Sequence, residues 1–595
     1  MKKRILLVIP ALLLAACTPF TPNTPSSSSN ESKTSSVSSS SIESVESHGT
    51  SQHSETSEES QTSSNSTTES ISTSQSEEES TTSIESQNSE SSESSEESVE
   101  STSSESTSSE DLNPLKTIDI YAINDFHGAI EDQGNSRIGL INMGSYMKKK
   151  GSEENTLLLD QGDTWQGSIY SNTNYGHLIN DVMCEARFDA RTIGNHDFDW
   201  GIDTLKQNTA RSYNGYTIPV LAANVYNYNF NTKVEGSVHQ SEIGAKTVSY
   251  TLENGVKVGI VGVIGSDQIT SINTMFTKDI CFKEHVSIIK TEATNLRNSG
   301  CDVVIASVHA SQDQVMDNGL ESYVDLVLCG HSHQVEFGEE GDLHYAQFGG
   351  YGQQLGHITL TYDTRVHDVT NTDVQTVSTY DVLTDLNGQT DTTIRNMVNA
   401  SMTDCSTLAN EVVASNVNGS FYSTSNLPNM MAKAIYDAAV SEGYSDITLA
   451  MVNNARTSLT DKTSWTYADI YQAFPFDNYI YIIEATGADI VNEAKYNYVC
   501  LNSTLAAQGS EKTLNRNTKY KVAVIDYLAV HTNSSRYYDY FRSADGEVKG
   551  TLSQTYRNVL KSWLNTNGYS SGTSLNYYDF TNNKDMFKKD ITLVS

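Results

Sequence analysis

The sequence predicts an α/β protein in which polar residues gather at the ends of buried strands. Five runs rich in aliphatic and β-branched residues have the length of a strand, namely 117–124, 156–160, 188–193, 303–308 and 323–329. Each run is followed at once by a short motif that contains Asp, Asn or His. Outside a signal-like start and a low-complexity stretch, roughly 480 residues remain, which is more than one hydrophobic core usually holds. We therefore expect at least two domains.

The five motifs contain the residue types that bind divalent metal ions. They are Asp125-Phe126-His127, Gly162-Asp163, Gly194-Asn195-His196-Asp197-Phe198-Asp199, His309, and Gly330-His331-Ser332-His333. In open α/β sheets, ligands bind outside the carboxyl ends of the strands, so motifs far apart in sequence can converge. Carboxylate, amide and neutral imidazole ligands suit zinc, manganese or iron, and no pair of cysteines competes for the role. One such motif alone is weak evidence, but five in order predict a two-metal site.

A two-metal site of this composition suits phosphoester hydrolysis. The phosphoester dianion repels a hydroxide nucleophile, and its alkoxide is a poor leaving group. Two neighbouring cations lower the pKa of a shared water towards about 7 and clamp the phosphoryl oxygens as the in-line displacement proceeds.

With these motifs, the chain resembles the 5'-nucleotidase family of calcineurin-like metallophosphoesterases, which includes ecto-5'-nucleotidases and periplasmic UDP-sugar hydrolases. The resemblance extends from about Lys116 to the C-terminus. It implies a four-layer αββα metallophosphoesterase domain at residues 114–365 and an α+β 5'-nucleotidase C-terminal domain, for substrate recognition, at 411–595. Between them, residues 366–410 form a connector that includes a linker helix, because the strand-like pattern fades after Tyr362 and 381–414 is polar and helix-prone.

The resemblance also implies a role for each motif residue. Asp125, His127 and His333 resemble the ligands of one metal, and Asn195, His309 and His331 resemble those of the second. Asp163 matches the carboxylate that bridges both metals. His196 and Asp199 match the catalytic dyad, in which His196 assists the phosphoryl or leaving oxygen and Asp199 fixes its tautomer. The family more often has Glu where Asp197 stands, at a position not expected to touch the substrate.

The second domain contains segments that are similar to the family's landmarks of nucleotide recognition. Phe476, in Phe474-Pro475-Phe476-Asp477-Asn478, resembles one of two aromatic residues that sandwich a nucleobase, and Tyr527 falls where the other is expected. Stacking holds any base, at about 1–3 kcal/mol each. Arg456 is expected to pair with phosphate or carboxylate, and Asn453 to hydrogen-bond the ligand.

The match weakens around these landmarks. Family members commonly carry a glycine-rich segment where this chain has Asn453-Asn454-Ala455-Arg456, and a Gly-Gly-Asp-Gly turn where it has Asn533-Ser534-Ser535-Arg536. The arginine expected shortly before Asn426 is missing, and residues 421–424 occupy that stretch. Sugar and terminal-group contacts can therefore differ from the family pattern, and an interpretation of Phe476 and Tyr527 as ordinary core aromatics remains open.

The amino terminus predicts export and lipid anchoring. Residues 1–16 read as a signal peptide, with Met-Lys-Lys-Arg followed by an apolar run, and Leu14-Ala15-Ala16-Cys17 resembles a bacterial lipobox. The resemblance implies cleavage before Cys17, lipidation of its thiol and attachment to the outer side of the bacterial membrane, although a simple secretory signal is the alternative. The apolar run is too short for a normal spanning helix.

Residues 17–113 predict a disordered tether, because Ser, Thr, Glu and Gln dominate and large apolar residues are nearly absent. The tether carries 19 acidic residues and one lysine, and so supplies half of the chain's net charge of −36. We expect a spacer, with a glycosylated stalk or a ligand-binding segment as alternatives. No basic patch predicts binding to a nucleic-acid polymer.

The sequence thus predicts an extracytoplasmic, lipid-anchored 5'-nucleotidase with two divalent metal ions. An alternative keeps the metal site but changes the substrate to a 2',3'-cyclic nucleotide, a UDP-sugar or another phosphoester. A third hypothesis is a surface binding protein on an inactive hydrolase scaffold, which the intact ligand set argues against. Six cysteines besides Cys17 permit up to three disulfides, and the pattern assigns no pairs.

Overall fold

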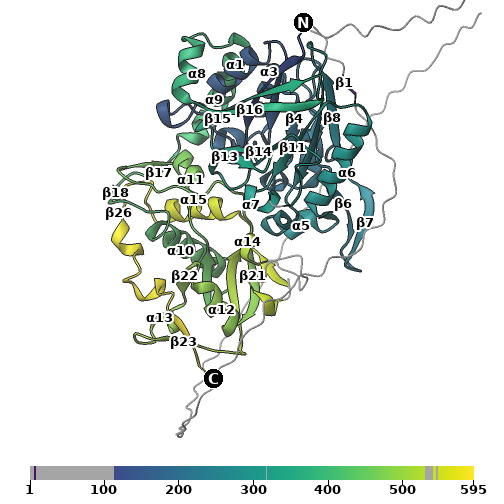
Figure 1. Cartoon of the computed structure of the whole chain (residues 1–595). Helices are drawn as coiled ribbons and strands as arrows, with labels where there is room; N and C mark the ends of the chain where they lie inside the picture. Colours follow the sequence, from purple (N-terminus) through teal and green to yellow (C-terminus); the bar gives the residue numbers. More distant parts are fainter. Residues whose placement is uncertain (1–5, 8–112, 317, 530–540, 545–546, 595) are drawn as a thin grey trace, which may run out of the picture. The chain divides into compact units, whose positions relative to one another are not determined.

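The computed structural model describes residues 6–7, 113–316, 318–529, 541–544 and 547–594 (Figure 1). Cys17, the predicted tether up to residue 112, and the segment Asn533-Ser534-Ser535-Arg536 lie outside the described residues. Of the predicted signal peptide, only Leu6–Leu7 is described, as the two-residue strand β1.

A six-stranded sheet carries the first three metal-binding motifs. Its order is β16-β15-β2-β3-β4-β5. The strands are β2 (Leu115–Ile123), β3 (Thr156–Asp160), β4 (Ala190–Thr192), β5 (Val220–Leu221), β15 (Gln354–Asp363) and β16 (Asp368–Ser378). The strands β2 to β5 are parallel, so their carboxyl ends share one edge.

A seven-stranded sheet carries the other two motifs. Its order is β1-β8-β9-β11-β12-β14-β13. Besides β1, the strands are β8 (Thr247–Thr251), β9 (Lys257–Ile264), β11 (Val303–His309), β12 (Leu326–Leu328), β13 (Val335–Glu340) and β14 (Leu343–Phe348). The central strands β9, β11, β12 and β14 are parallel. The five predicted strands therefore all form, but they belong to two sheets.

The two sheets pack face to face, and helices cover their outer faces. In β2, Ile118 and Ile120 enter the core between the sheets, whereas Tyr121 and Ile123 face the helices on the other side. This alternation is the period of a strand. The seven-stranded sheet buries its outer face against α6 (His285–Asn298). These layers confirm the αββα architecture.

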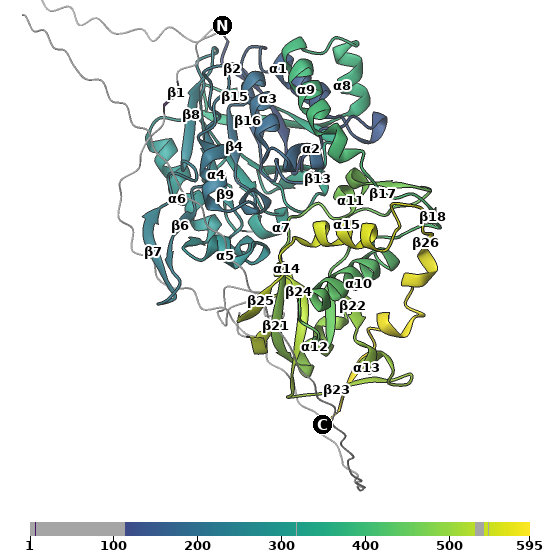
Figure 2. The same cartoon turned by 180° about the vertical axis from the view of Figure 1, so that it is seen from behind.

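Helices α1 (Leu140–Lys150) and α3 (His177–Ala186) cover the six-stranded sheet, and α8 (Thr379–Leu386) and α9 (Thr392–Ala409) lie beside them (Figures 1 and 2). The long helix α9 forms within the predicted connector, where Asp391 caps its first turn by accepting a hydrogen bond from Ile394 N at 3.0 Å. The remaining elements of this half are α2 (Ile169–Asn172), α4 (Ile202–Thr209), α5 (Thr274–Thr277), α7 (Gln312–Val315), β6 (Val225–Asn229), β7 (Val234–His239) and β10 (Ile280–Phe282).

Strand β16 is a difference from the sequence-based expectation. The strand-like pattern fades after Tyr362, yet β16 pairs antiparallel with β15 along its whole length. It is an edge strand with mostly half-exposed or exposed residues, so it lacks the apolar run that marks a buried strand. The sheet consequently extends to Ser378, past residue 365.

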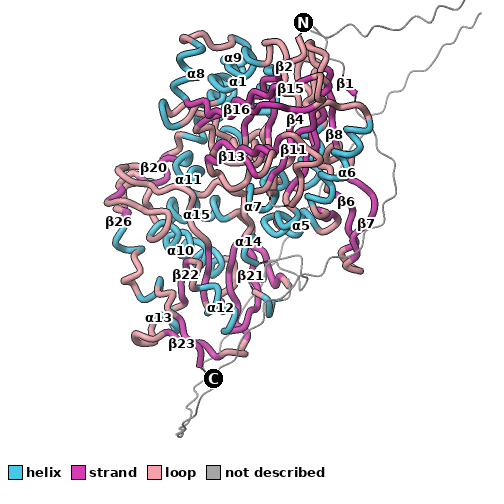
Figure 3. Tube along the Cα trace, in the orientation of Figure 1, coloured by secondary structure: helices cyan, strands magenta, loops and turns pink. Residues whose placement is uncertain are grey.

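The C-terminal half has α+β architecture, as expected. A five-stranded sheet with the order β22-β19-β24-β21-β25 is covered by α10 (Asn426–Ser441), which also packs against α15 (Tyr556–Thr566) (Figure 3). The sheet strands are β19 (Leu449–Val452), β21 (Ile480–Thr486), β22 (Tyr498–Leu501), β24 (Lys519–Ile525) and β25 (Val548–Thr551). The other elements are β17 (Val412–Ala414), β18 (Val417–Asn418), β20 (Trp465–Thr466), α11 (Tyr467–Ala473), α12 (Gly487–Ala494), α13 (Ser503–Ala506), β23 (Lys512–Asn515), α14 (Asp526–Ala529), β26 (Leu575–Asn576) and β27 (Ile591–Val594).

The six cysteines of the described residues are all free thiols, namely Cys184, Cys281, Cys301, Cys329, Cys405 and Cys500. Within the part of the chain that the structure describes, no helix combines the length and the apolar character that a membrane span requires.

Candidate active site

The loops that leave the parallel strands bring the predicted metal ligands together. Asp125 and His127 follow β2, Asp163 follows β3, Asn195 follows β4, His309 ends β11, and His331 and His333 follow β12. Because the carboxyl ends of both sheets meet at one place, residues from five separate segments converge there.

One group of ligands consists of Asp125, His127 and His333. The Nε2 atoms of His127 and His333 are 3.1 Å apart, and His333 Nε2 lies 3.4 Å from Asp125 Oδ1. Asp125 is fully buried and is held by the amide of Asn124, which donates to its Oδ2 at 2.7 Å. Three donor atoms of this spacing can share one cation.

The second group contains Asp163, His309 and His331, with Asn195 beside them. Asn195 Oδ1 lies 3.1 Å from His309 Nε2 and 3.0 Å from His331 Nδ1. The amide oxygen of Asn195 therefore faces the same point as the two imidazoles.

Asp163 lies between the two groups. Its Oδ1 accepts a hydrogen bond from His196 N at 2.8 Å, which fixes the carboxylate. Its Oδ2 is 3.2 Å from His309 Nε2 in one group and 3.7 Å from His127 Nε2 in the other. One oxygen within reach of both groups is the geometry that a bridging ligand requires.

The backbone is left-handed at five of these positions. The φ angles are 49° at Asp125, 47° at His127, 54° at Asp163, 74° at His331 and 58° at His333. Asp and His are among the few non-glycine residues that adopt this conformation with some frequency. The turns need glycine as well, because a Cβ on Gly194 would lie 2.2 Å from Asp163 Oδ1.

The donor set fits two divalent cations. Zinc bonds of about 2.0–2.2 Å place neighbouring ligand atoms a little over 3 Å apart, as found here. His309 Nδ1 faces Gln161 O at 2.8 Å and His127 Nδ1 faces Gln166 O at 3.0 Å. These contacts orient both rings so that Nε2 is left for a metal, which is the usual outer-shell arrangement.

The electrostatics of the groups also suit cations. Burial lowers the pKa of His127 to about 3 and that of His331 to about 4, so both imidazoles are neutral at pH 7. Burial opposes ionisation of Asp163, but the nearby histidines outweigh it and hold its pKa well below the usual range. Burial likewise opposes charge on His309, yet Asp163 raises the pKa of that ring to about 10. The site therefore favours positive charge beside Asp163.

His196 and Asp199 form a hydrogen-bonded pair at the edge of the two groups of candidate metal ligands, which are called the metal groups below. His196 Nδ1 lies 2.8 Å from Asp199 Oδ2, so the other ring nitrogen is left unconstrained by this contact. Burial disfavours the charged imidazole, but the carboxylates of Asp199 and Asp163 outweigh burial and raise the pKa of His196. The pair can hold and deliver a proton.

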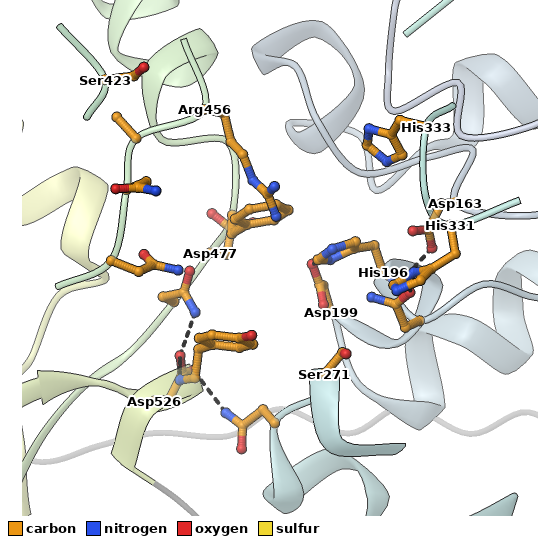
Figure 4. A pocket seen from close by; sticks show the side chains of 18 of the residues that line it. Asp163, His196, Asp199, Ser271, His331, His333, Ser423, Arg456, Asp477 and Asp526 are labelled. Atoms are coloured by element: carbon orange, nitrogen blue, oxygen red, sulfur yellow. Dashed lines mark hydrogen bonds and ion pairs between the residues drawn. The ribbon is translucent and has the colours of Figure 1, made fainter. Parts of the chain in front are cut away.

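A cavity of about 660 Å³ opens over the metal groups (Figure 4). His196, His331 and His333 line it from the N-terminal half, and the predicted substrate contacts line it from the C-terminal half: Asn453, Arg456, Phe476 and Tyr527. Ser423 and Thr424, in the stretch where the family arginine is missing, also line it. All four predicted substrate residues thus share one cavity with the metal ligands.

Phe476 contacts the dyad directly. Its ring stacks on His196 with 4.5 Å between centroids and 13° between planes, so one face of the predicted base-stacking ring is covered. The Arg456 guanidinium carbon lies 4.8 Å from the centroid of the same ring. Sequence reasoning gave no indication of this stack, because it joins residues of two domains.

Arg557 is a buried residue that sequence reasoning missed. Its guanidinium donates to Phe474 O at 2.9 Å and to Phe476 O at 2.7 Å, and it also pairs with Asp477. It therefore holds the segment that carries Phe476. The available signal was a cation at a core-facing position of an amphipathic helix, α15.

The same segment is held from the N-terminal half. Gln166 and Asn172 both donate to Pro475 O, and Trp200 Nε1 donates to Asp477 Oδ2 at 3.1 Å. The position of Phe476 over His196 thus depends on both halves of the molecule.

Two further residues support the metal groups. Tyr351 stacks on His127 with 5.1 Å between centroids; its only sequence signal is the surrounding Gly349-Gly350-Tyr351-Gly352 turn. Asp197, expected not to touch substrate, is buried, accepts from Gly194 N at 2.8 Å and pairs with Arg191 at 2.7 Å.

Two family models match the chain. One, described as calcineurin-like phosphoesterase, matches residues 118–335. The other, described as 5'-nucleotidase, C-terminal domain, matches residues 389–493. The first range includes all seven predicted metal ligands and the dyad, and the second includes Asn453, Arg456 and Phe476.

The curated relatives of the chain have low sequence identity to it. A cell wall protein of Listeria monocytogenes is 25% identical over 470 residues, covering 64% of this chain and 56% of that protein. A 5'-nucleotidase of Diplobatis ommata is 27% identical over 234 residues, covering 36% of this chain and 38% of that protein. The chain spans between about a third and just over half of the length of the first relatives that it matches.

Solved structures share the fold. A 5'-nucleotidase precursor from Thermus thermophilus matches with a TM-score of 0.62, covering 81% of this chain and 100% of that chain, at 16% identity.

Proposed function

Because the chain belongs to the calcineurin-like metallophosphoesterases with a 5'-nucleotidase C-terminal domain, we propose that it releases phosphate from nucleotides outside the cytoplasm. The observation that carries this proposal is a single cavity, bounded on one side by two ligand groups that share Asp163 and on the other by Phe476, Arg456 and Asn453. A phosphoryl group and a nucleoside can be bound there at once.

The two ligand groups would hold one divalent cation each, zinc, manganese or iron. Asp125, His127 and His333 would hold the first, Asn195, His309 and His331 the second, and Asp163 both. Bound cations would supply an activated water and charge stabilisation for the phosphoryl group.

His196 assists the reaction from the protein side. Its Nδ1 is engaged by Asp199, so its Nε2 is the atom that can donate a hydrogen bond to a phosphoryl oxygen or a proton to the leaving oxygen. Asp199 acts through His196, since it fixes the tautomer and favours the protonated ring.

In this proposal, residues of the C-terminal half bind the nucleotide. Phe476 and Tyr527 offer aromatic faces for the base, Asn453 offers an amide for hydrogen bonds, and Arg456 offers a guanidinium for an oxyanion. Because His196 covers one face of Phe476, a base that stacks on that face has to part the two rings.

Export and lipid anchoring at Cys17 remain part of the proposal. They rest on the signal-like start and the lipobox-like sequence. A relative that is named as a cell wall protein agrees with a location outside the cytoplasm.

The test is phosphate release by the full chain with added manganese or zinc. The substrates are AMP, ADP, ATP, 2',3'-cyclic AMP, UDP-glucose and p-nitrophenyl phosphate. Release from nucleotides that Asp163→Ala abolishes supports the proposal. Phe476→Ala should weaken nucleotide hydrolysis about tenfold or more, through the lost stacking, and should spare p-nitrophenyl phosphate. Phe337→Ala, at a 46% exposed phenylalanine on β13, is the matched control. Hydrolysis of p-nitrophenyl phosphate alone would refute nucleotide recognition.

A further inference from the structure

Asp526 is a buried carboxylate in the wall of the active-site cavity, and the proposed mechanism does not use it. It follows β24 directly, and both Asp526 and its neighbour Tyr527 line the cavity. Only 5% of Asp526 is exposed. A buried charge is unfavourable unless it is paired or hydrogen-bonded, so the groups around this carboxylate indicate what it does.

Four hydrogen-bond donors surround the carboxylate and engage both of its oxygens. Oδ1 accepts from Asn478 Nδ2 at 2.6 Å and from Tyr527 N at 2.8 Å. Oδ2 accepts from Tyr479 N at 3.0 Å and from Asn273 Nδ2 at 2.9 Å. The dashed lines at Asp526 in Figure 4 mark the two side-chain bonds.

The carboxylate is saturated by these donors. Burial raises the pKa of Asp526 to about 6, although the hydrogen bonds pull it down, so the group is mostly ionised at pH 7. An ionised carboxylate has about four acceptor sites, and four donors already occupy this one. We therefore expect Asp526 to act through its neighbours and not by touching the substrate.

Three of the donors belong to the segments that carry the two aromatic residues of the cavity. Asn478 lies two residues after Phe476, and Tyr527 N belongs to the first turn of α14. The backbone of Tyr479 also accepts from Asp526 N at 2.9 Å. The carboxylate consequently joins the segment of Phe476 to the turn of Tyr527.

The fourth donor comes from the other half of the molecule. Asn273 directly precedes α5 in the N-terminal half and also lines the cavity. Through Asn273, the same carboxylate reaches the half that contains the metal groups. One buried charge thus connects both aromatic segments to each other and to the side of the cavity where a phosphoryl group would bind.

We propose that Asp526 is a positioning residue that sets the gap between Phe476 and Tyr527, and thereby the affinity for the base. The inference rests on the proposed function and deepens it. Stacking depends on close contact with both ring faces, and a gap of about 0.5–1 Å already forfeits about a quarter to a half of the contact energy. A small displacement of either segment should therefore weaken binding of the base without changing the metal groups.

Asp526→Asn is the first test, because it replaces one oxygen by an NH2 group. Whichever way the amide is turned, two of the four donors then face another donor. We expect the KM for AMP to rise about tenfold, as part of the stacking contribution is lost, while kcat stays within about twofold. Ribose 5-phosphate, which has the same sugar and phosphate without the base, should keep its KM. The assay is steady-state phosphate release by the full chain with added manganese.

A second variant tests the bond between Asp526 and Asn478. Asn478→Asp places two carboxylates against each other and should also raise the KM for AMP. Combined with Asp526→Asn, it restores a donor opposite an acceptor, so the double variant should have a lower KM for AMP than either single variant. This rescue decides the role of the bond even where Asp526→Asn alone fails to fold.

The matched control is Asp489→Asn, in the same half of the molecule. Asp489 also accepts from a backbone amide, Ser543 N at 2.7 Å, but it does not line the cavity, so neither KM should change. An unchanged KM for AMP in Asp526→Asn, an equal rise for ribose 5-phosphate, or a double variant without rescue overturns the positioning role alone. A wild-type chain that hydrolyses no nucleotide overturns the proposed function, and the positioning role with it.

Discussion

Replacement of Asp199 by Asn tests whether the dyad works as a unit. The substitution preserves shape but removes the charge that faces His196 Nδ1 at 2.8 Å. A hydrogen bond to a charged group contributes about 1.5–3 kcal/mol, which corresponds to about a 10- to 150-fold loss of kcat. Metal content should not change, because Asp199 belongs to neither ligand group. The assay is steady-state phosphate release from AMP, together with metal analysis of the same preparation.

The double variant decides whether Asp199 acts through His196. In a His196→Ala background, Asp199→Asn should cause no further loss, because its only proposed route to the substrate is gone. Asp203→Asn, an exposed aspartate on α4, is the matched control and should retain full activity. Independent, multiplying losses in the double variant, or an Asp199→Asn rate close to the wild-type rate, would refute the reasoning.

Three further predictions concern stability. Arg557→Met should lower the free energy of unfolding by about 3 kcal/mol in urea titrations, because it leaves Asp477 and two carbonyls without their buried donor; a loss below about 1 kcal/mol contradicts this. Burial raises the pKa of Glu493 to about 7, so the folded chain keeps a proton that the unfolded chain releases near pH 4.5, and stability falls as pH rises between these values. Glu493→Gln should therefore stabilise the protein at pH 8 by about 1–2 kcal/mol after allowance for solvent screening and leave it unchanged at pH 4; equal effects at both pH values would count against it. EDTA should lower Tm and manganese should restore it, since cations bind the folded state; an unchanged Tm argues against preformed metal groups.

The convergence of the candidate metal ligands at the strand ends could be predicted from sequence because their signal is local. An aliphatic run such as 303–308 predicts a strand, and the His309 that follows has to lie at its carboxyl end. Convergence then follows from parallel pairing, which aligns those ends. The polar, helix-prone composition of the connector also predicts a helix there, and α9 forms with Asp391 as its cap.

Other features could not be predicted because they depend on partners far away in the chain. Strand β16 is polar on most positions, and only its pairing with β15 makes it a strand. The stack of Phe476 on His196 depends on the packing of one half of the molecule against the other. The sequence pattern suggests that Arg557 is a surface cation. Its carbonyl partners at Phe474 and Phe476 lie about 80 residues away in the chain.

The left-handed backbone at five candidate ligand positions costs the fold stability. Each such non-glycine residue costs about 1 kcal/mol or more in backbone energy. Glycine at Asp125, His127, Asp163, His331 or His333 would relieve that cost and destroy the donor set. Selection for stability alone would therefore remove the candidate metal-binding donors, and screens for thermostable variants should recover variants that have lost them first.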